Sequence, residues 1–137
     1  MSANGAVMQG KKGLIMGVAN DRSIAWAIAK MAADHGAELA FTYQGDALRK
    51  RVEPLATSVG ADLVMPCDVT DDTAVAATFE DLAKRWSQVD FVLHAIAYSD
   101  KEQLKGQYAE TTRDNFLRTM DISCYSFTAV ARHAAPL

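Results

Sequence analysis

Residues 13–25 read GLIMGVANDRSIA, a short apolar run that turns at Gly17 and enters a helical pattern near Ser23. A strand, a glycine turn and the start of a helix form a phosphate site, because free backbone N–H groups and the positive helix end face the anion. The stretch departs from the G-x-G-x-x-G pattern, since Ser23 and Ala25 stand where other dinucleotide folds often have glycine. A tight turn in which Ser23 only caps the helix is therefore the alternative interpretation.

Three more short apolar runs follow along the chain, at residues 39–43, 62–65 and 91–96. Little inside them alternates between apolar and polar, which is typical of strands buried on both faces of a parallel sheet. Between the runs, apolar residues recur at steps of three and four, which predicts helices whose apolar stripes form the core. The four stripes are Ile24, Ile28, Met31 and His35; Leu48, Val52, Leu55 and Val59; Val75, Phe79, Leu82 and Trp86; and Phe116, Met120, Cys124, Phe127, Ala131 and Ala134.

The alternation of strands and helices predicts an α/β fold with a doubly wound parallel sheet. Right-handed crossovers place helices on both faces, and the first four strands take the order 3-2-1-4 of the Rossmann-type fold. Pro54 lacks the amide hydrogen that would bond the carbonyl of Lys50, which predicts a break near residues 52–53. Residues 111–114 supply cap-type side chains at the start of the last helix, and Pro136 marks its end.

Composition places the chain among ordinary globular domains. It has 137 residues, 50% of them hydrophobic and 23% charged, and a net charge of −3. A negative chain argues against a nucleic-acid surface, and no apolar run approaches the roughly 20 residues of a membrane span. Residues 1–10 lack the regions of a signal peptide and are expected to form a disordered leader. Cys67 and Cys124 form no CxxC pair, so reduced thiols in a cytoplasmic protein are expected, and the histidines lie at no metal-ligand spacing.

Two further positions indicate how a dinucleotide would bind. The residue at the end of the second strand normally selects between an adenosine 2′-hydroxyl and a 2′-phosphate. Gln44 stands there and the nearest base is Arg49, a pattern that favours NADH over NADPH. Asp68 ends the third strand, where a carboxylate can accept a hydrogen bond from the adenine amino group. Capping of the next helix by Asp68, Asp71 and Asp72 is an equally good interpretation.

Five stretches of the chain are informative together: Gly17 to Ala25, Gly36 to Gln44, Cys67 to Val69, Asp121 to Ser123 and Tyr125 to Phe127. In their order and spacing they resemble the divergent short-chain dehydrogenases, and more narrowly the bacterial NADH-dependent enoyl-acyl-carrier-protein reductases of fatty-acid elongation. The resemblance covers the chain after the leader, so residues 11–137 are expected to form the N-terminal part of a single NAD-binding domain. It implies an enoyl thioester on acyl carrier protein as the substrate.

The resemblance also implies roles for individual residues. The residues implied to bind the cofactor are Gly17, Ser23 and Ile24 at the pyrophosphate and nearby ribose, Gln44 at the adenosine ribose, Asp68 and Val69 at the adenine, and Ile96. The backbone of Tyr98 and Ser99 would border the acyl pocket. Ala95 and Ala97 depart from the serine and glycine common in the family, and Ala97 adds a methyl group near the nicotinamide ribose.

The catalytic residues that the resemblance implies, a tyrosine and a lysine on a helix after a fifth strand, have no counterpart in this chain. Tyr43 with Lys50 and Tyr98 with Lys105 have the bare spacing, but the first pair straddles a strand end and the second lies in a loop. No catalytic residue is assigned here, and the chain is expected to be part of a longer enzyme.

The complete protein is expected to be a homotetramer, because the family packs the long helix after the fourth strand against its copy in another subunit. Ile122 and Ala129 lie off the main stripe of that helix, and a helix buried on two sides requires a second apolar face.

Two other functions stay open at this level. Another short-chain dehydrogenase that acts on a carbonyl is the nearest, although such enzymes usually have Asn-Ala-Gly where this chain has Ala95-Ile96-Ala97. A nucleotide-binding module without catalysis is the alternative of a different class. Such a module would bind NADH without oxidising it on any enoyl thioester.

Overall fold

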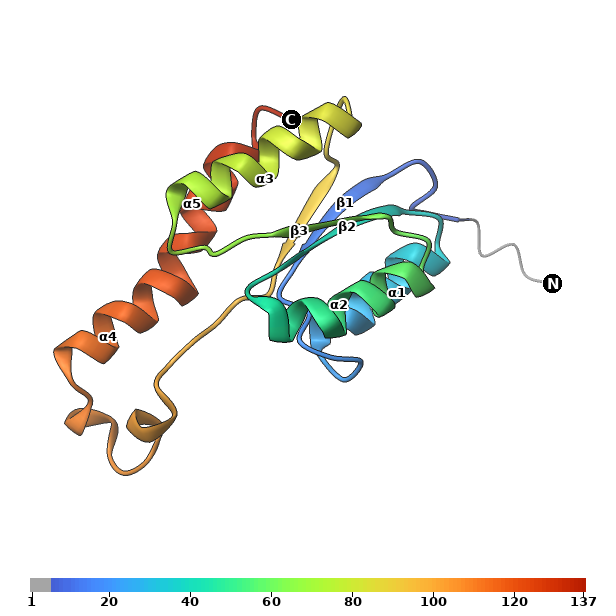
Figure 1. Ribbon diagram of the computed structural model, residues 1–137. Coiled ribbons are helices and arrows are strands. Elements are labelled where there is room, and N and C mark those ends of the chain that lie inside the picture. Colours follow the sequence, from blue (N-terminus) through green and yellow to red (C-terminus); the bar gives the residue numbers. More distant parts are fainter. Residues whose placement is uncertain (1–5) are drawn as a thin grey trace.

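Four parallel strands form the centre of the structure, a computed structural model that describes residues 6–137 (Figure 1). They are β1 (Lys12–Met16), β2 (Glu38–Tyr43), β3 (Leu63–Pro66) and β4 (Phe91–His94). The order across the sheet is β3-β2-β1-β4 and every pairing is parallel, which confirms the predicted topology. Met16 pairs with Thr42 of β2 and with His94 of β4, so the carboxyl ends of these strands meet at one edge.

Helices cover both faces of this sheet. α1 (Ile24–Asp34) and α2 (Asp46–Ser58) pack on one face, and α3 (Asp72–Arg85) and α5 (Ser126–Ala134) pack on the other (Figure 1). Alternate side chains of β1 pack on opposite faces of the sheet. Ile15 belongs to the core beneath α1 and α2, whereas Leu14 and Met16 belong to the core beneath α3 and α5. Burial on both sides explains why the strand sequences are apolar without alternation.

The predicted core stripe is right for α3 and wrong for α1. Val75, Phe79, Leu82 and Trp86 are buried as expected, but the buried residues of α1 are Ala25, Trp26, Ala29 and Ala32. Ile24, Ile28 and Met31 are exposed instead. This helix is apolar on most sides, so periodicity cannot choose between its faces. The alanines let the helix approach the sheet closely, and Trp26 packs beside Phe41 with ring centres 6.4 Å apart.

The predicted break in α2 is also wrong. The helix runs from Asp46 to Ser58 and contains Pro54 within it. The carbonyl that loses its hydrogen-bond partner belongs to Lys50, which is exposed, so water can take the place of the missing amide. Val52 and Ala56, which lie on the opposite side of the helix, are fully buried and hold it against the sheet.

The last helical region consists of three parts in place of the one predicted helix. α4 (Arg113–Met120) is followed by a π-helical segment, η3 (Asp121–Tyr125), and then by α5. The Thr112 hydroxyl caps α4 by accepting from the Asn115 amide at 3.2 Å, in agreement with the predicted start. One extra residue in the π segment rotates the following helix by about 100° relative to a regular α-helix.

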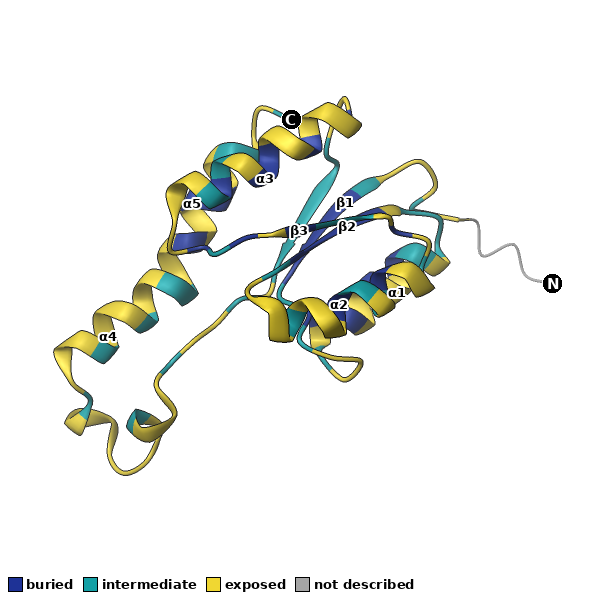
Figure 2. Ribbon diagram, in the orientation of Figure 1, coloured by how far each residue is buried: buried dark blue, intermediate teal, exposed yellow. Residues whose placement is uncertain are grey.

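The inner and outer faces of the region are the reverse of those predicted, in α4 as well as after the π segment. The prediction placed Ile122 and Ala129 on the outer face, whereas Ala129 is buried and Ile122 packs against the core. Val130 and Ser126 are buried beside them. Exposed residues cover most of α4 (Figure 2). The exposed members of the stripe predicted to be core are Phe116, Met120, Cys124, Phe127 and Ala131.

Two short segments complete the described chain. The connection between β4 and α4 contains two 3₁₀ helices, η1 (Lys101–Leu104) and η2 (Tyr108–Glu110). Before β1, residues 6–10 form a turn in which the Met8 amide donates to the His35 carbonyl at 3.0 Å. The expected leader disorder therefore does not extend to this turn, and residues 1–5 lie outside the part that the structure describes.

None of the helices within residues 6–137 combines the length and the apolar character that crossing a bilayer requires. In the same part of the chain, no three histidine, cysteine or acidic side chains gather as they would around a metal ion. Cys67 is a buried free thiol and Cys124 an exposed one.

Candidate functional site

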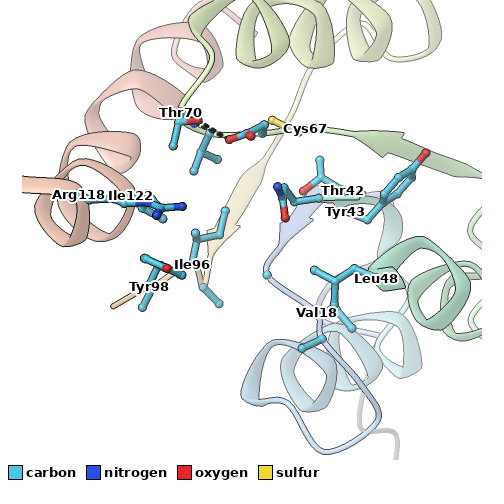
Figure 3. Close-up of a pocket in the computed structure, with 17 residues that line it drawn as sticks. Val18, Thr42, Tyr43, Leu48, Cys67, Thr70, Ile96, Tyr98, Arg118 and Ile122 are labelled. Carbon is cyan, nitrogen blue, oxygen red and sulfur yellow. Dashed lines mark hydrogen bonds between the residues drawn. The ribbon is translucent and has the colours of Figure 1, made fainter. Parts of the chain in front are cut away.

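A cavity of about 380 Å³ opens where the strands end at their carboxyl edge (Figure 3). Its walls come from the residues that follow all four strands, together with α2, α4 and the π segment. The lining residues are Gly17, Val18, Ala19, Thr42, Tyr43, Gln44, Leu48, Cys67, Asp68, Val69, Thr70, Ala95, Ile96, Ala97, Tyr98, Arg118 and Ile122. The edge is the one at which open α/β sheets bind their ligands.

Gly17 lies where the chain leaving β1 runs close to the chain leaving β4. Its backbone has a φ of +107°, and a Cβ at this position would collide with the carbonyl oxygen of Ala95. The approach is fixed by a ladder bond, in which the Ala95 amide donates to the Met16 carbonyl at 2.9 Å. Only glycine fits both the conformation and the space. The glycine that the sequence assigned to a phosphate turn is thus also required by the contact between two strand ends.

The loop between Gly17 and α1 is closed by its own hydrogen bonds. The Ser23 hydroxyl donates to the Asn20 carbonyl at 2.5 Å, and the Arg22 amide donates to the Asn20 side chain at 2.8 Å. Ser23 occupies the N-cap position of α1, but its side chain makes no capping hydrogen bond. Neither Ser23 nor Ile24 lines the cavity, and Ile24 is 79% exposed.

Asp68 and Asp71, which the sequence could not separate, have different roles. Asp71 is the N-cap of α3 and accepts from the amides of Thr73 and Ala74. Asp68 lines the cavity, where it accepts from the Thr70 hydroxyl at 2.7 Å and from the Thr70 amide at 2.9 Å. These bonds, with a smaller one from Gln44, hold the pKa of Asp68 below its usual value. The cavity therefore presents an ionised carboxylate beside the Gln44 amide.

The π segment holds the residues that leave β4. The Tyr98 amide donates to the Ser123 hydroxyl at 2.9 Å, and that hydroxyl donates to the Tyr98 carbonyl at 3.2 Å. The Ser126 hydroxyl donates to the Ile122 carbonyl at 2.6 Å, so it accepts from His94 Nε2, 2.8 Å away. Burial lowers the pKa of His94, which keeps the ring neutral. The two serines thus tie β4 and the cavity wall that follows it to the helical region.

Of the predicted binding residues, the structure brings Gly17, Gln44, Asp68, Val69 and Ile96 to the cavity. Ser99 lies outside the lining and contacts Asn115 and Thr119 of α4 at 3.3 and 3.2 Å. Sequence reasoning missed Arg118 and did not assign Ile122 to the site. The two are four residues apart and share a helix face, but the predicted stripe of that helix pointed elsewhere.

A parallel sheet in this order, with a glycine turn after β1 and a cavity at the strand ends, defines an α/β protein of the Rossmann class. A profile of the family described as enoyl-(acyl carrier protein) reductase matches residues 17–137. The chain therefore belongs to this family.

Individual relatives agree with the profile. The chain is 62% identical over 131 residues to enoyl-(acyl-carrier-protein) reductase (NADH) 2 of Rhizobium meliloti strain 1021, and the aligned part covers 96% of this chain and 49% of the relative. A crystal structure of the reductase from Anaplasma phagocytophilum in complex with NAD matches with a TM-score of 0.93 and 52% identity, over 100% of this chain and 53% of that one. The reductase from Aquifex aeolicus matches with a TM-score of 0.93 at 45% identity, over 95% and 52% of the two chains. The chain spans about half the length of the relatives it matches.

Proposed function

We propose that this chain is part of an NADH-dependent enoyl-acyl-carrier-protein reductase, which reduces the double bond of an enoyl thioester during fatty-acid elongation. The observation that carries the proposal is the cavity at the strand ends, where Gly17, Gln44, Asp68 and Ile96 come together from four strands. Membership of the family supports the same reaction, since matched relatives carry the enoyl reductase name with NADH. NADH supplies the hydride for the reduction when it is bound.

The residues present fit an adenine dinucleotide. Asp68 is an ionised acceptor for an exocyclic amino group, and Gln44 offers a neutral amide to a ribose hydroxyl. Val69, Ile96 and Ile122 give the same cavity apolar walls for a flat base. We assign adenosine to these residues, and the pyrophosphate and adjoining ribose to Gly17, Ser23 and Ile24, at the positive end of α1.

The chain's own contribution is to bind and orient. The hydrogen bonds between the Ser123 hydroxyl and the Tyr98 backbone fix the cavity wall next to Ile96, and we place Ile96 against the cofactor. Ser99 is hydrogen-bonded to α4, and we place it near the acyl chain of the substrate. The family's catalytic tyrosine and lysine are not assigned to any residue of this chain. Residues 11–137 would then be the N-terminal part of one NAD-binding domain.

We further propose that the complete protein is a cytoplasmic homotetramer whose substrate is carried on acyl carrier protein. The apolar residues Phe116, Met120 and Phe127 support the assembly, because they are exposed on α4 and α5 and could be covered by another subunit. This face replaces the one around Ile122 and Ala129 that the sequence suggested. A monomer in sedimentation at micromolar concentration would contradict the assembly.

The test of the function uses the full-length protein with NADH and a crotonyl thioester, and follows the loss of NADH absorbance. Oxidation of NADH that depends on the thioester supports the reductase. Oxidation only with a ketone substrate would support the carbonyl-reducing alternative, and binding of NADH without oxidation on either would support a non-catalytic module.

Two aspartates provide a matched pair for the binding site. Asp68→Ala removes a hydrogen bond to a charged group and should weaken NADH binding about tenfold, on the basis of roughly 1.5 kcal/mol for such a bond. Asp71→Ala removes the α3 cap and should cost about 0.5–2 kcal/mol of stability while leaving NADH affinity unchanged. Equal NADH affinities for the two variants would refute the placement of adenosine at Asp68.

A further inference from the structure

Arg118 and Asp68 are the two charged side chains among the described residues that line the cavity. Arg118 comes from the last turn of α4 and extends into the cavity from the side opposite Thr42 and Tyr43 (Figure 3). Its guanidinium lies over the ring of Tyr98, 4.7 Å from the ring centre. Among the residues that the structure describes, Arg118 is thus the one cation on the wall that faces the ends of β2 and β3.

No ion pair in the described part of the chain accounts for this position. Asp114 and Asp121 lie four residues before and three residues after Arg118, where a helical neighbour could pair with it, yet no salt bridge forms with either within residues 6–137. The described structure also gives the guanidinium no hydrogen bond to a side chain or carbonyl. Its N–H donors, of which an arginine has five, therefore remain available to a ligand.

Tyr98 holds the guanidinium in place. The backbone of Tyr98 is bonded in both directions to the Ser123 hydroxyl, which fixes the backbone position from which the ring extends to Arg118. Stacking on an aromatic face leaves the planar fork of an arginine free to bind at its edge. A side chain restrained in this way loses less conformational entropy when it binds.

We propose that Arg118 is a specificity-determining residue that recognises a phosphate group of a bound ligand. The guanidinium fork matches the geometry of phosphate oxygens, and no other cation of the described cavity lining can neutralise one. The inference rests on the proposed function, which supplies two sources of phosphate. One is the phosphate ester in the pantetheine arm that carries the enoyl thioester, and the other is the pyrophosphate of NADH.

The test compares Arg118→Met with the unmodified full-length protein on two substrates that differ by one phosphate, crotonyl-phosphopantetheine and crotonyl-pantetheine. Methionine keeps the apolar stem over Tyr98 and removes the charge. The KM for crotonyl-phosphopantetheine should rise about three- to tenfold with little change in kcat, since an exposed charged hydrogen bond has this order of effect. The KM for crotonyl-pantetheine should not change, and Arg118→Lys should restore part of the difference.

Binding of NADH, followed by its fluorescence, separates the two sources. A rise of similar size in the Kd of NADH, with unchanged discrimination between the thioesters, identifies the pyrophosphate as the recognised group. Arg113→Met is the control, because Arg113 is exposed on the same helix and does not line the cavity. Thermal unfolding of each variant shows whether it is folded.

Two outcomes would overturn the inference. One is an Arg118→Met variant that matches Arg113→Met in both KM values and in NADH affinity. The other is an equal rise in the KM values for both thioesters with no change in NADH affinity, because such a rise does not depend on the phosphate and indicates a change in the structure of the cavity wall. If the unmodified protein reduces neither thioester, the proposed function fails, and the NADH titration of Arg118→Met alone decides whether the arginine recognises phosphate.

Discussion

Replacing Gly17 by alanine should lower the free energy of unfolding more than the same change at a glycine that has free space for a Cβ. The φ of Gly17 is +107°, and the left-handed region costs an L-residue about 1–2 kcal/mol. The added methyl group would also run into the carbonyl oxygen of Ala95, and overpacking of this kind costs about 1–3 kcal/mol. Ala95 cannot retreat without losing the ladder bond to Met16. The two effects together predict a loss of about 2–5 kcal/mol in the free energy of unfolding.

Gly60→Ala is the matched control. Gly60 has a φ of +75°, but a Cβ there would have no atom within 4 Å. Its replacement should therefore cost only the backbone term of about 1–2 kcal/mol. Urea unfolding of the two full-length variants at equal protein concentration measures both losses, since the proposed assembly would make stability depend on concentration. NADH affinity should fall in Gly17→Ala and stay unchanged in Gly60→Ala. A loss of stability no larger for Gly17→Ala than for Gly60→Ala would refute the steric argument.

Three further predictions concern the cofactor, the titration of the strand end and the chain by itself. Gln44→Arg should move the ratio of kcat/KM values toward NADPH by giving its 2′-phosphate a cation, and an unchanged ratio would contradict the placement of Gln44 at the ribose. The pKa of His94 is lower in the folded protein than in the unfolded chain, so the unfolded chain binds a proton more readily. The contribution of His94 to folding stability is therefore present above the ordinary histidine pKa of about 6.5, and it is lost as the pH falls through the pKa of the folded state. His94→Gln should flatten that part of the pH dependence in urea unfolding. Residues 1–137 alone should not oxidise NADH with a crotonyl thioester, because no tyrosine hydroxyl of this chain is assigned to the enolate oxygen. The loss of one such preorganised donor costs about a hundred- to a thousandfold in rate. Clear turnover would require a catalytic group within residues 1–137, and Tyr98 would be the first residue to replace.

Much of the candidate site follows from the sequence because it lies at strand ends. Gly17, Gln44 and Asp68 come after apolar runs and Ile96 ends one, and the carboxyl ends of parallel strands meet at one edge. Arg118 could not be found in this way, because it enters the cavity from a helix. Its place depends on how that helix is rotated against the sheet. Asp68 and Asp71 were equivalent in sequence, and only their hydrogen bonds showed that the second is the cap.

The sequence alone was enough to predict the alternation of strands and helices, the parallel sheet and which residues lie near the strand ends. These features depend on local patterns: apolar runs for strands buried on both faces, and the short connections between elements. Tertiary structure decided which face of a helix is inside wherever two apolar faces compete. In α1 the alanines beside Trp26 pack on the sheet and leave Ile24 and Met31 exposed. After α4, the helical region also has two apolar faces, and Ile122 and Ala129 pack inside while Cys124 and Phe127 stay exposed. Periodicity measures the spacing of apolar residues, but the face that packs is decided by how closely the helix can approach the sheet, and this depends on the shapes of both surfaces.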